Sequence, residues 1–166
     1  MFIYRKATIE DLNKIWDKDI NNHPNDDRWK RWKDRYIKDN QEGKCATFVV
    51  LKNDTPIGQI TVLYSPDCGS VAGKPLLCNG KDTANMNAFR IEKEYEGQGH
   101  ISKLVKMAEE YSKKLGIKYM TIGSEAKESR NLGIYLHFGY NKFIMHEFDD
   151  EEEDNPLVLY YQKELK

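Results

Sequence analysis

The stretch that most constrains the fold runs from residue 85 to residue 115, where an extended apolar segment passes through a glycine turn into an amphipathic helix. The turn is Gly97-Gln98-Gly99. Apolar residues before and after the turn fit a strand followed by an amphipathic helix. Gly116 predicts the end of that helix. The extended part carries Met86, Ala88, Phe89 and Ile91, and one helical face carries Ile101, Leu104, Val105, Ala108, Tyr111 and Leu115.

A strand, a glycine turn and a helix in this order leave backbone N–H groups at the helix N-terminus, where the helix dipole adds positive potential. The arrangement therefore predicts a site for an anion, most often a phosphate. A plain turn that needs glycine only for its angle is the alternative. The sequence lacks a following Gly-Lys-Ser/Thr, which excludes a Walker-type loop, and the missing third glycine disfavours a dinucleotide-binding fingerprint.

Length and composition predict one soluble domain over residues 1–166, with 39% hydrophobic and 32% charged residues. No apolar run approaches the roughly 20 residues that span a bilayer, and the first residues lack a signal-peptide core, so we expect a cytoplasmic protein without membrane contact. The net charge of −1 gives no reason to expect nucleic acid as a partner. Three cysteines without a CxxC pair indicate neither a disulfide framework nor a zinc site, and we expect no metal.

The remaining patterns predict an α/β (α+β) fold with a mixed, mostly antiparallel sheet around a central βαβ unit. Residues 45–64 predict an antiparallel hairpin, and residues 65–83, rich in Gly, Pro and Ser, predict a long surface loop. The strands expected at 85–91 and 118–124 flank the central helix and should be parallel. Further strands are expected at 2–6, 141–148 and 157–163, and further helices at 9–20, 26–40 and 129–138.

The predicted helix at 26–40 interleaves basic and aromatic residues, a pattern that also occurs on nucleic-acid-binding faces. Its aromatic residues Trp29, Trp32 and Tyr36 share one helical stripe, and four aspartates offset much of the basic charge. We therefore favour a packed helix with a solvated face.

Two segments carry a family resemblance. The turn before Leu104 resembles the coenzyme-A-binding core of the GNAT superfamily of N-acetyltransferases, with Gly99 at the first required glycine. Glu96 stands where the family usually has Arg or Gln, and Ile101 where it has a small residue. The segment at 129–140 resembles a second family motif. That motif is an Asn, then a Tyr, then Gly and an aromatic four residues after the Tyr, here Asn131, Tyr135, Gly139 and Tyr140.

The resemblance implies acetyl-coenzyme A as co-substrate and assigns residues to its parts. Main-chain groups of Phe89 and Ile91 would pair with the pantetheine arm like an added strand. The phosphates would bind the turn formed by Gly97, Gln98, Gly99, His100 and Ile101. For the His100 side chain two interpretations stay open, a phosphate donor and a solvated surface residue.

Tyr135 would give a proton to the departing thiolate, and Asn131 would contact the cofactor or cap its helix. Glu92 and Glu125 are candidate bases at strand ends, although solvated carboxylates are the alternative for both.

The resemblance implies transfer of an acetyl group to a primary amine by direct attack. The six acidic residues at 149–154 would attract a cationic acceptor, or would simply form a solvated loop. A GNAT-fold module that holds an acyl-coenzyme A weakly, or not at all, is the alternative function, which Glu96 and Ile101 favour. Dimers are frequent in families of this shape, so a homodimer is among the states implied.

Overall fold

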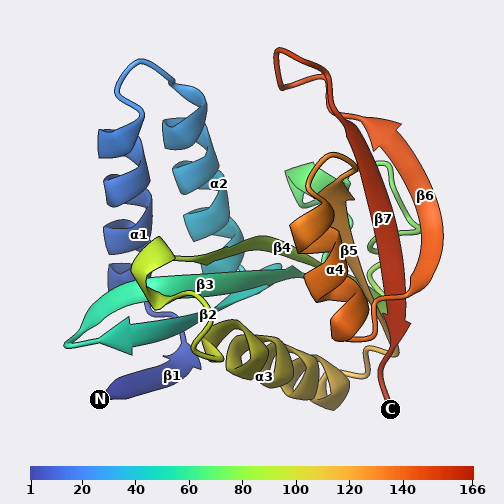
Figure 1. The fold of residues 1–166 in the computed structure, drawn as a ribbon, viewed down its shortest axis with the longest axis horizontal. Helices are drawn as coiled ribbons and strands as arrows, with labels where there is room; N and C mark the ends of the chain where they lie inside the picture. Colours follow the sequence, from blue (N-terminus) through green and yellow to red (C-terminus); the bar gives the residue numbers. More distant parts are fainter. The chain divides into compact units, whose positions relative to one another are not determined.

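The computed structural model describes residues 1–166 and contains seven strands and four α-helices (Figure 1). It divides into two compact units. The first unit comprises Met1–Val62 and Ala88–Ala108, and the second comprises Leu63–Asn87 and Glu109–Lys166. The strand β4 and the helix α3 each contribute residues to both units, and the single domain expected from length stays a prediction.

The elements lie close to the predicted ones. The strands are β1 (Phe2–Lys6), β2 (Cys45–Lys52), β3 (Thr55–Leu63), β4 (Thr83–Ile91), β5 (Tyr119–Glu125), β6 (Lys142–Phe148) and β7 (Leu157–Glu164). The α-helices are α1 (Ile9–Asn22), α2 (Arg28–Gln41), α3 (His100–Lys114) and α4 (Ser129–His137), with short 3-10 helices η1 (Gly69–Val71) and η2 (Lys93–Tyr95).

The strand order is β1-β2-β3-β4-β5-β7-β6. Strands β1 and β2, β5 and β7, and β6 and β7 pair antiparallel, whereas β4 and β5 pair in parallel. The mixed, mostly antiparallel sheet with a central βαβ unit is therefore confirmed. The parallel ladder joins Thr83–Met86 to Tyr119–Ile122, and β5 continues to Glu125 in its ladder with β7.

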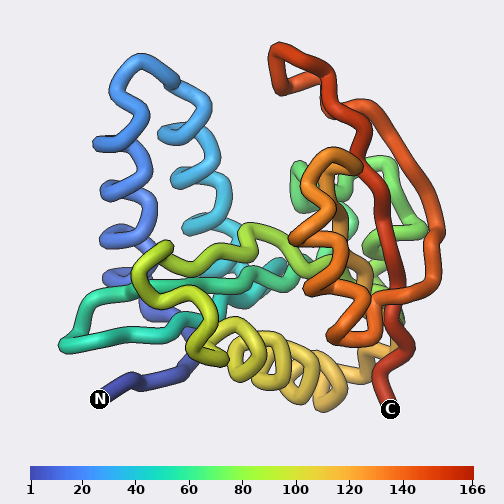
Figure 2. The backbone as a smooth tube through the Cα atoms, viewed as in Figure 1, coloured from blue at the N-terminus to red at the C-terminus, as the bar shows by residue number.

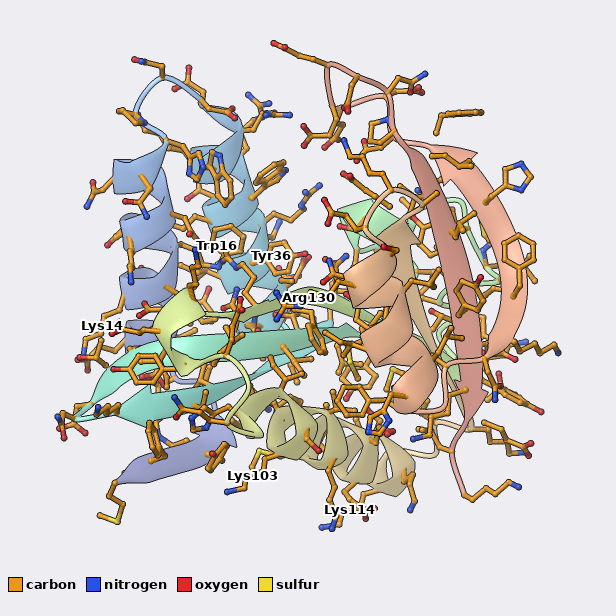
Figure 3. The ribbon with its side chains drawn as sticks, in the orientation of Figure 1. Lys14, Trp16, Tyr36, Lys103, Lys114 and Arg130 are labelled. Atoms are coloured by element: carbon orange, nitrogen blue, oxygen red, sulfur yellow. The ribbon has the colours of Figure 1, made fainter.

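In the first unit, α1 begins with a capping box formed by Thr8 and Asp11. The Asp11 N–H donates to the Thr8 hydroxyl at 3.2 Å, and the Thr8 N–H donates to the Asp11 carboxylate at 2.8 Å. Helices α1 and α2 run side by side, and the trace reverses between them (Figure 2). Trp16 and Tyr36 face each other between these helices with ring centroids 5.0 Å apart (Figure 3). The packed-helix interpretation of α2 is therefore confirmed.

In the second unit, most residues of the segment at 65–82 are exposed or half-buried, as in the predicted surface loop, but four of them are buried. Leu77 and Cys78 are fully buried, as are Cys68 and Val71. The Thr121 hydroxyl of β5 donates to the Leu77 carbonyl at 2.8 Å, and the Cys78 thiol donates to the Leu63 carbonyl at 3.4 Å. The turn residues of this segment indicated a loop correctly, but its apolar residues pack into the unit.

The end of α3 confirms one expectation and corrects another. Gly116 has a left-handed backbone (φ 86°), and its N–H donates to the Lys113 carbonyl at 3.0 Å, so the helix stops where predicted. Leu115 was expected on the buried face, yet it lies just beyond the helix and is 54% exposed. None of the helices is long and apolar enough to cross a membrane.

Candidate functional site

The glycine turn of the first unit adopts a backbone that only glycine takes easily. Gly97 (φ 73°) and Gly99 (φ 84°) are both left-handed. The carbonyl of Gly99 accepts the first bond of α3, from the Lys103 N–H at 3.2 Å, so Gly99 stands at the N-cap. Because glycine has no side chain, it leaves the first N–H groups of α3 without a side-chain cap.

The side chains of the turn stabilise its shape. The Gln98 amide donates to the Glu94 carbonyl at 3.3 Å, and its oxygen lies 3.3 Å from Nε2 of His100. His100 Nδ1 lies 2.6 Å from the Tyr4 hydroxyl of β1, and the Phe2 ring packs at 4.4 Å between centroids.

His100 is only 4% exposed, so the interpretation of a solvated surface residue is wrong. Both ring nitrogens already have partners, and a bond from this side chain to a phosphate would have to replace one of them. Burial, and to a lesser extent the charge of Lys103, lowers the pKa of His100 below its ordinary value. The ring is therefore neutral at pH 7. Its predicted role as a phosphate donor stays a prediction. The helical spacing to Leu104 and Ala108 is a sequence signal that could have shown its burial.

The turn can hold an anion through its main chain. A Cβ atom at Gly97 or Gly99 would meet no other atom within 4 Å, so the space beside both residues is open. Lys103 lies in the first turn of α3 with its Nζ 4.9 Å from the centre of the Tyr4 ring, and it adds positive charge to the helix dipole. Glu96 is exposed and Ile101 is half-buried.

The part of β4 that belongs to the first unit has an unusual backbone and a close neighbour. Ala88 is left-handed (φ 49°), a conformation that costs a non-glycine residue energy. Phe89 and Ile91 follow it and are half-buried. A Cβ atom on Gly58 of β3 would lie 2.6 Å from Ile91 Cδ1 and 3.1 Å from the Arg90 carbonyl oxygen. Gly58 therefore permits the close approach of β3 and β4 here, a requirement that no local sequence pattern signals.

The second unit holds the two motif residues of α4. Tyr135 is buried, and burial raises its pKa to about 12, so its hydroxyl stays protonated over the physiological range. Asn131 is exposed and lies inside α4, whose N-cap position is occupied by Glu128, so the helix-capping alternative for Asn131 is wrong. The two candidate bases pair with lysines, Glu92 with Lys18 in the first unit and Glu125 with Lys127 at 3.5 Å in the second.

A further polar cluster of the second unit was not predicted. Glu147 of β6 accepts hydrogen bonds from the Tyr160 hydroxyl at 2.6 Å and from Lys74 Nζ at 2.7 Å. Burial alone raises the pKa of Glu147, but these two donors lower it below its ordinary value. Gly123 leaves room for the Tyr160 ring, because a Cβ atom added at residue 123 would lie 2.6 Å from that ring. The cluster ties the segment at 65–82 to the sheet.

The fold is shared with solved acetyltransferases. An N-acetyltransferase from Staphylococcus aureus Mu50 has a TM-score of 0.71 at 17% identity, with 100% of this chain and 99% of that chain covered. The ribosomal-protein-S18-alanine N-acetyltransferase from Escherichia coli has a TM-score of 0.72 at 14% identity, covering 100% and 95%. A Salmonella typhimurium structure, described as an acetyltransferase with its cofactor acetyl-CoA, gives 0.72 at 14% identity, also covering 100% and 95%.

These likenesses show that the chain shares the fold of these acetyltransferases. The chain belongs to the acetyltransferase (GNAT) family, whose model matches residues 7–140. The comparison with curated protein sequences finds no match.

Proposed function

We propose that the protein transfers the acetyl group of acetyl-coenzyme A to a primary amine by direct attack. The observation that carries the proposal is the turn at residues 97–101. Two left-handed glycines, an N-cap without a side chain and open space together present main-chain donors to an anion. A coenzyme A pyrophosphate is such an anion, and the Salmonella typhimurium neighbour is described with acetyl-CoA. The contacts of the turn side chains with one another support a main-chain role in binding.

The nitrogen of the neutral amine attacks the thioester carbonyl carbon, a C–N bond forms and the C–S bond breaks. Tyr135 gives its proton to the departing sulfur, and the proton lost by the amine passes to solvent through a base that is not assigned. The pKa of Tyr135, raised to about 12 by burial, suits a group that must carry a proton at neutral pH. The main chain of Phe89 and Ile91 would hold the pantetheine arm.

The experiment that tests the proposal is calorimetric titration of the protein with acetyl-coenzyme A. The blocking variant is Gly99→Trp, which places a large side chain in the open space beside the turn. Gly43→Trp is the matched control, because Gly43 is also left-handed (φ 72°), has the same open surroundings and lies in the same unit outside the turn. Both variants carry the same backbone strain.

We expect saturable binding to the wild type and to Gly43→Trp, and no binding to Gly99→Trp. An amine screen with acetyl-coenzyme A would then follow the release of free thiol. Equal binding of acetyl-coenzyme A to both tryptophan variants would show that the cofactor does not bind at the turn.

A second function is favoured by two particular side chains. Glu96 brings a carboxylate to the turn, and Ile101 brings a β-branched side chain to the first turn of α3. If wild type fails to bind acetyl-coenzyme A at millimolar concentration, a GNAT-fold module without catalysis becomes the better conclusion. The charge-removing variant Glu96→Gln separates the two outcomes, because it should restore binding if repulsion of the phosphates is the cause.

A further inference from the structure

The last turn of α4 is closed by a backbone motif that holds Tyr135. The Tyr140 N–H donates to the Tyr135 carbonyl at 3.0 Å, and the Gly139 N–H donates to the Leu136 carbonyl at 3.0 Å. Gly139 between them is left-handed (φ 95°). Two such bonds around a left-handed glycine form a Schellman motif, which satisfies the last carbonyl groups of a helix. The backbone position of Tyr135 therefore depends on the position of Tyr140.

Tyr140 is buried, but its side chain makes no hydrogen bond that would fix it. The residue is 1% exposed, and its hydroxyl has no hydrogen-bond partner. Burial, and to a lesser extent the charge of Glu109, raises the pKa of Tyr140, so the hydroxyl stays protonated. The hydroxyl of a buried tyrosine usually finds a partner that also orients the ring. Here the orientation of the ring depends on the groups that pack against it.

Lys163 of β7 is one of these groups. Its Nζ lies 5.7 Å from the centre of the Tyr140 ring, a distance at which a cation is attracted to an aromatic face. Its side-chain stem runs beside Gly139, where an added Cβ atom would meet Lys163 Cε at 3.4 Å and Cδ at 3.5 Å. Lys163 therefore lies against both residues that close the last turn of α4.

Glu109 of α3 fixes the ammonium group of Lys163. Lys163 Nζ donates to both carboxylate oxygens of Glu109, at 2.7 and 2.8 Å. Glu109 is buried and Lys163 is half-buried. Separating such a pair leaves an uncompensated buried charge, which is strongly unfavourable. The ammonium group therefore keeps one position, unlike that of an exposed lysine.

We propose that the Glu109–Lys163 pair positions Tyr135, acting through Gly139 and Tyr140. The pair joins α3 and β7 to the end of α4, and the Schellman motif transmits this fixed position to the backbone of Tyr135. The inference rests on the proposed function for the role of Tyr135 as the acid, but not for the positioning itself. A proton donor that moves by about 1 Å can lose a hundredfold in rate, so its position matters for the reaction.

Fluorine NMR of protein labelled with 3-fluorotyrosine tests the positioning without any reaction. The chain has ten tyrosines, and the signal that is lost in Tyr135→Phe belongs to Tyr135. Lys163→Met keeps an unbranched stem beside Gly139 and removes the ammonium group. The double variant Glu109→Gln with Lys163→Met leaves no buried charge without a partner. Lys142→Met is the matched control, because Lys142 is an exposed lysine of β6 in the same unit.

We expect the Tyr135 signal to shift or broaden beyond its linewidth in Lys163→Met and to stay unchanged in Lys142→Met. Lys163→Met should also lower the thermal midpoint, because the Glu109 carboxylate loses its partner. The double variant should recover most of that midpoint and keep the altered Tyr135 signal, because positioning needs the charged pair itself. If Lys163→Met does not fold, the double variant decides.

Thiol release from acetyl-coenzyme A, with ethylamine as the probe amine, gives a second readout. The double variant should lower kcat about tenfold to a hundredfold, as for a misplaced catalytic group. It should leave the KM of acetyl-coenzyme A unchanged, because the pair holds the acid and not the cofactor. Lys142→Met should change neither constant.

The inference is overturned if the Tyr135 signal is unchanged in both Lys163 variants. It is also overturned if the signal of the double variant returns to that of wild type together with the thermal midpoint, since the pair would then serve stability alone. The proposed function fails separately. A wild type that binds no acetyl-coenzyme A and releases no thiol, with the expected signal changes in its variants, would preserve the positioning of Tyr135 and remove its role as the acid.

Discussion

Replacing Gly58 with alanine should destabilise the first unit and distort the strand proposed to hold the pantetheine arm. The added Cβ would lie 2.6 Å from Ile91 Cδ1, and 3.1 Å from both the Arg90 oxygen and Val50 Cγ1. Carbon atoms normally rest about 3.5–4.0 Å apart, so Ile91 must move by about 1 Å. Overpacking of this kind costs about 1–3 kcal/mol of unfolding free energy, which for a chain of this size lowers the midpoint by roughly 2–10 °C.

The assay is urea unfolding followed by tryptophan fluorescence, combined with a double-mutant cycle. Ile91→Val removes the atom that clashes and should cost about 0.5–1.5 kcal/mol alone. If the clash with Cδ1 dominates, the double variant should be more stable than the sum of the two single losses by about 1 kcal/mol. Gly133→Ala is the matched control, since Gly133 lies in α4 with no atom within 4 Å of its Cβ position. It should stabilise the protein by about 0.5–1 kcal/mol.

If Gly58→Ala is as stable as wild type, or if the stability losses of Gly58→Ala and Ile91→Val simply add, the proposed clash between the added Cβ and Ile91 Cδ1 is wrong. A second readout connects the strand to the site. Gly58→Ala should weaken acetyl-coenzyme A binding, and Gly133→Ala should leave it unchanged.

Three further predictions concern the groups of the candidate site. Tyr135→Phe should lower turnover by about a hundredfold or more with little change in acetyl-coenzyme A affinity, while Tyr119→Phe should not; equal turnover would remove Tyr135 from the acid role. Because the pKa of His100 is lowered by burial in the folded state, the unfolded chain binds more protons below about pH 6.5, so stability falls as pH drops through this range. His100→Gln should flatten that dependence in unfolding titrations at pH 7.5 and 5.0, and the exposed His146→Gln should leave it unchanged. Replacing the acidic residues at 149–154 with Ser or Gln should raise the KM of a cationic acceptor at low salt and leave that of a zwitterionic one unchanged; no change for either would make the run a plain solvated loop.

The elements were predictable where their signals are local. The capping box of Thr8 and Asp11 fixed the start of α1, and Gly116 fixed the end of α3, because each depends on residues within one turn. Hydrophobic periodicity placed the strands to within a few residues. The glycine turn was predictable in the same way, since its backbone needs residues that lack a Cβ atom.

The environments that depend on distant partners were not predictable. His100 is buried against Tyr4, 96 residues earlier, and Leu77 is held by Thr121, 44 residues later. Gly58 carries no local signal either, because its need for glycine comes from Ile91 on the neighbouring strand.

The burial of all three cysteines gives the protein a built-in measure of local opening. Cys45 lies in the first unit, and Cys68 and Cys78 lie in the second. A thiol reagent reaches a buried cysteine only when the surrounding structure opens, so the rate of labelling reports the free energy of that opening. Variants that keep only one of the three cysteines would therefore report the opening of each unit separately. The same measurement with acetyl-coenzyme A present would show which unit the ligand holds closed.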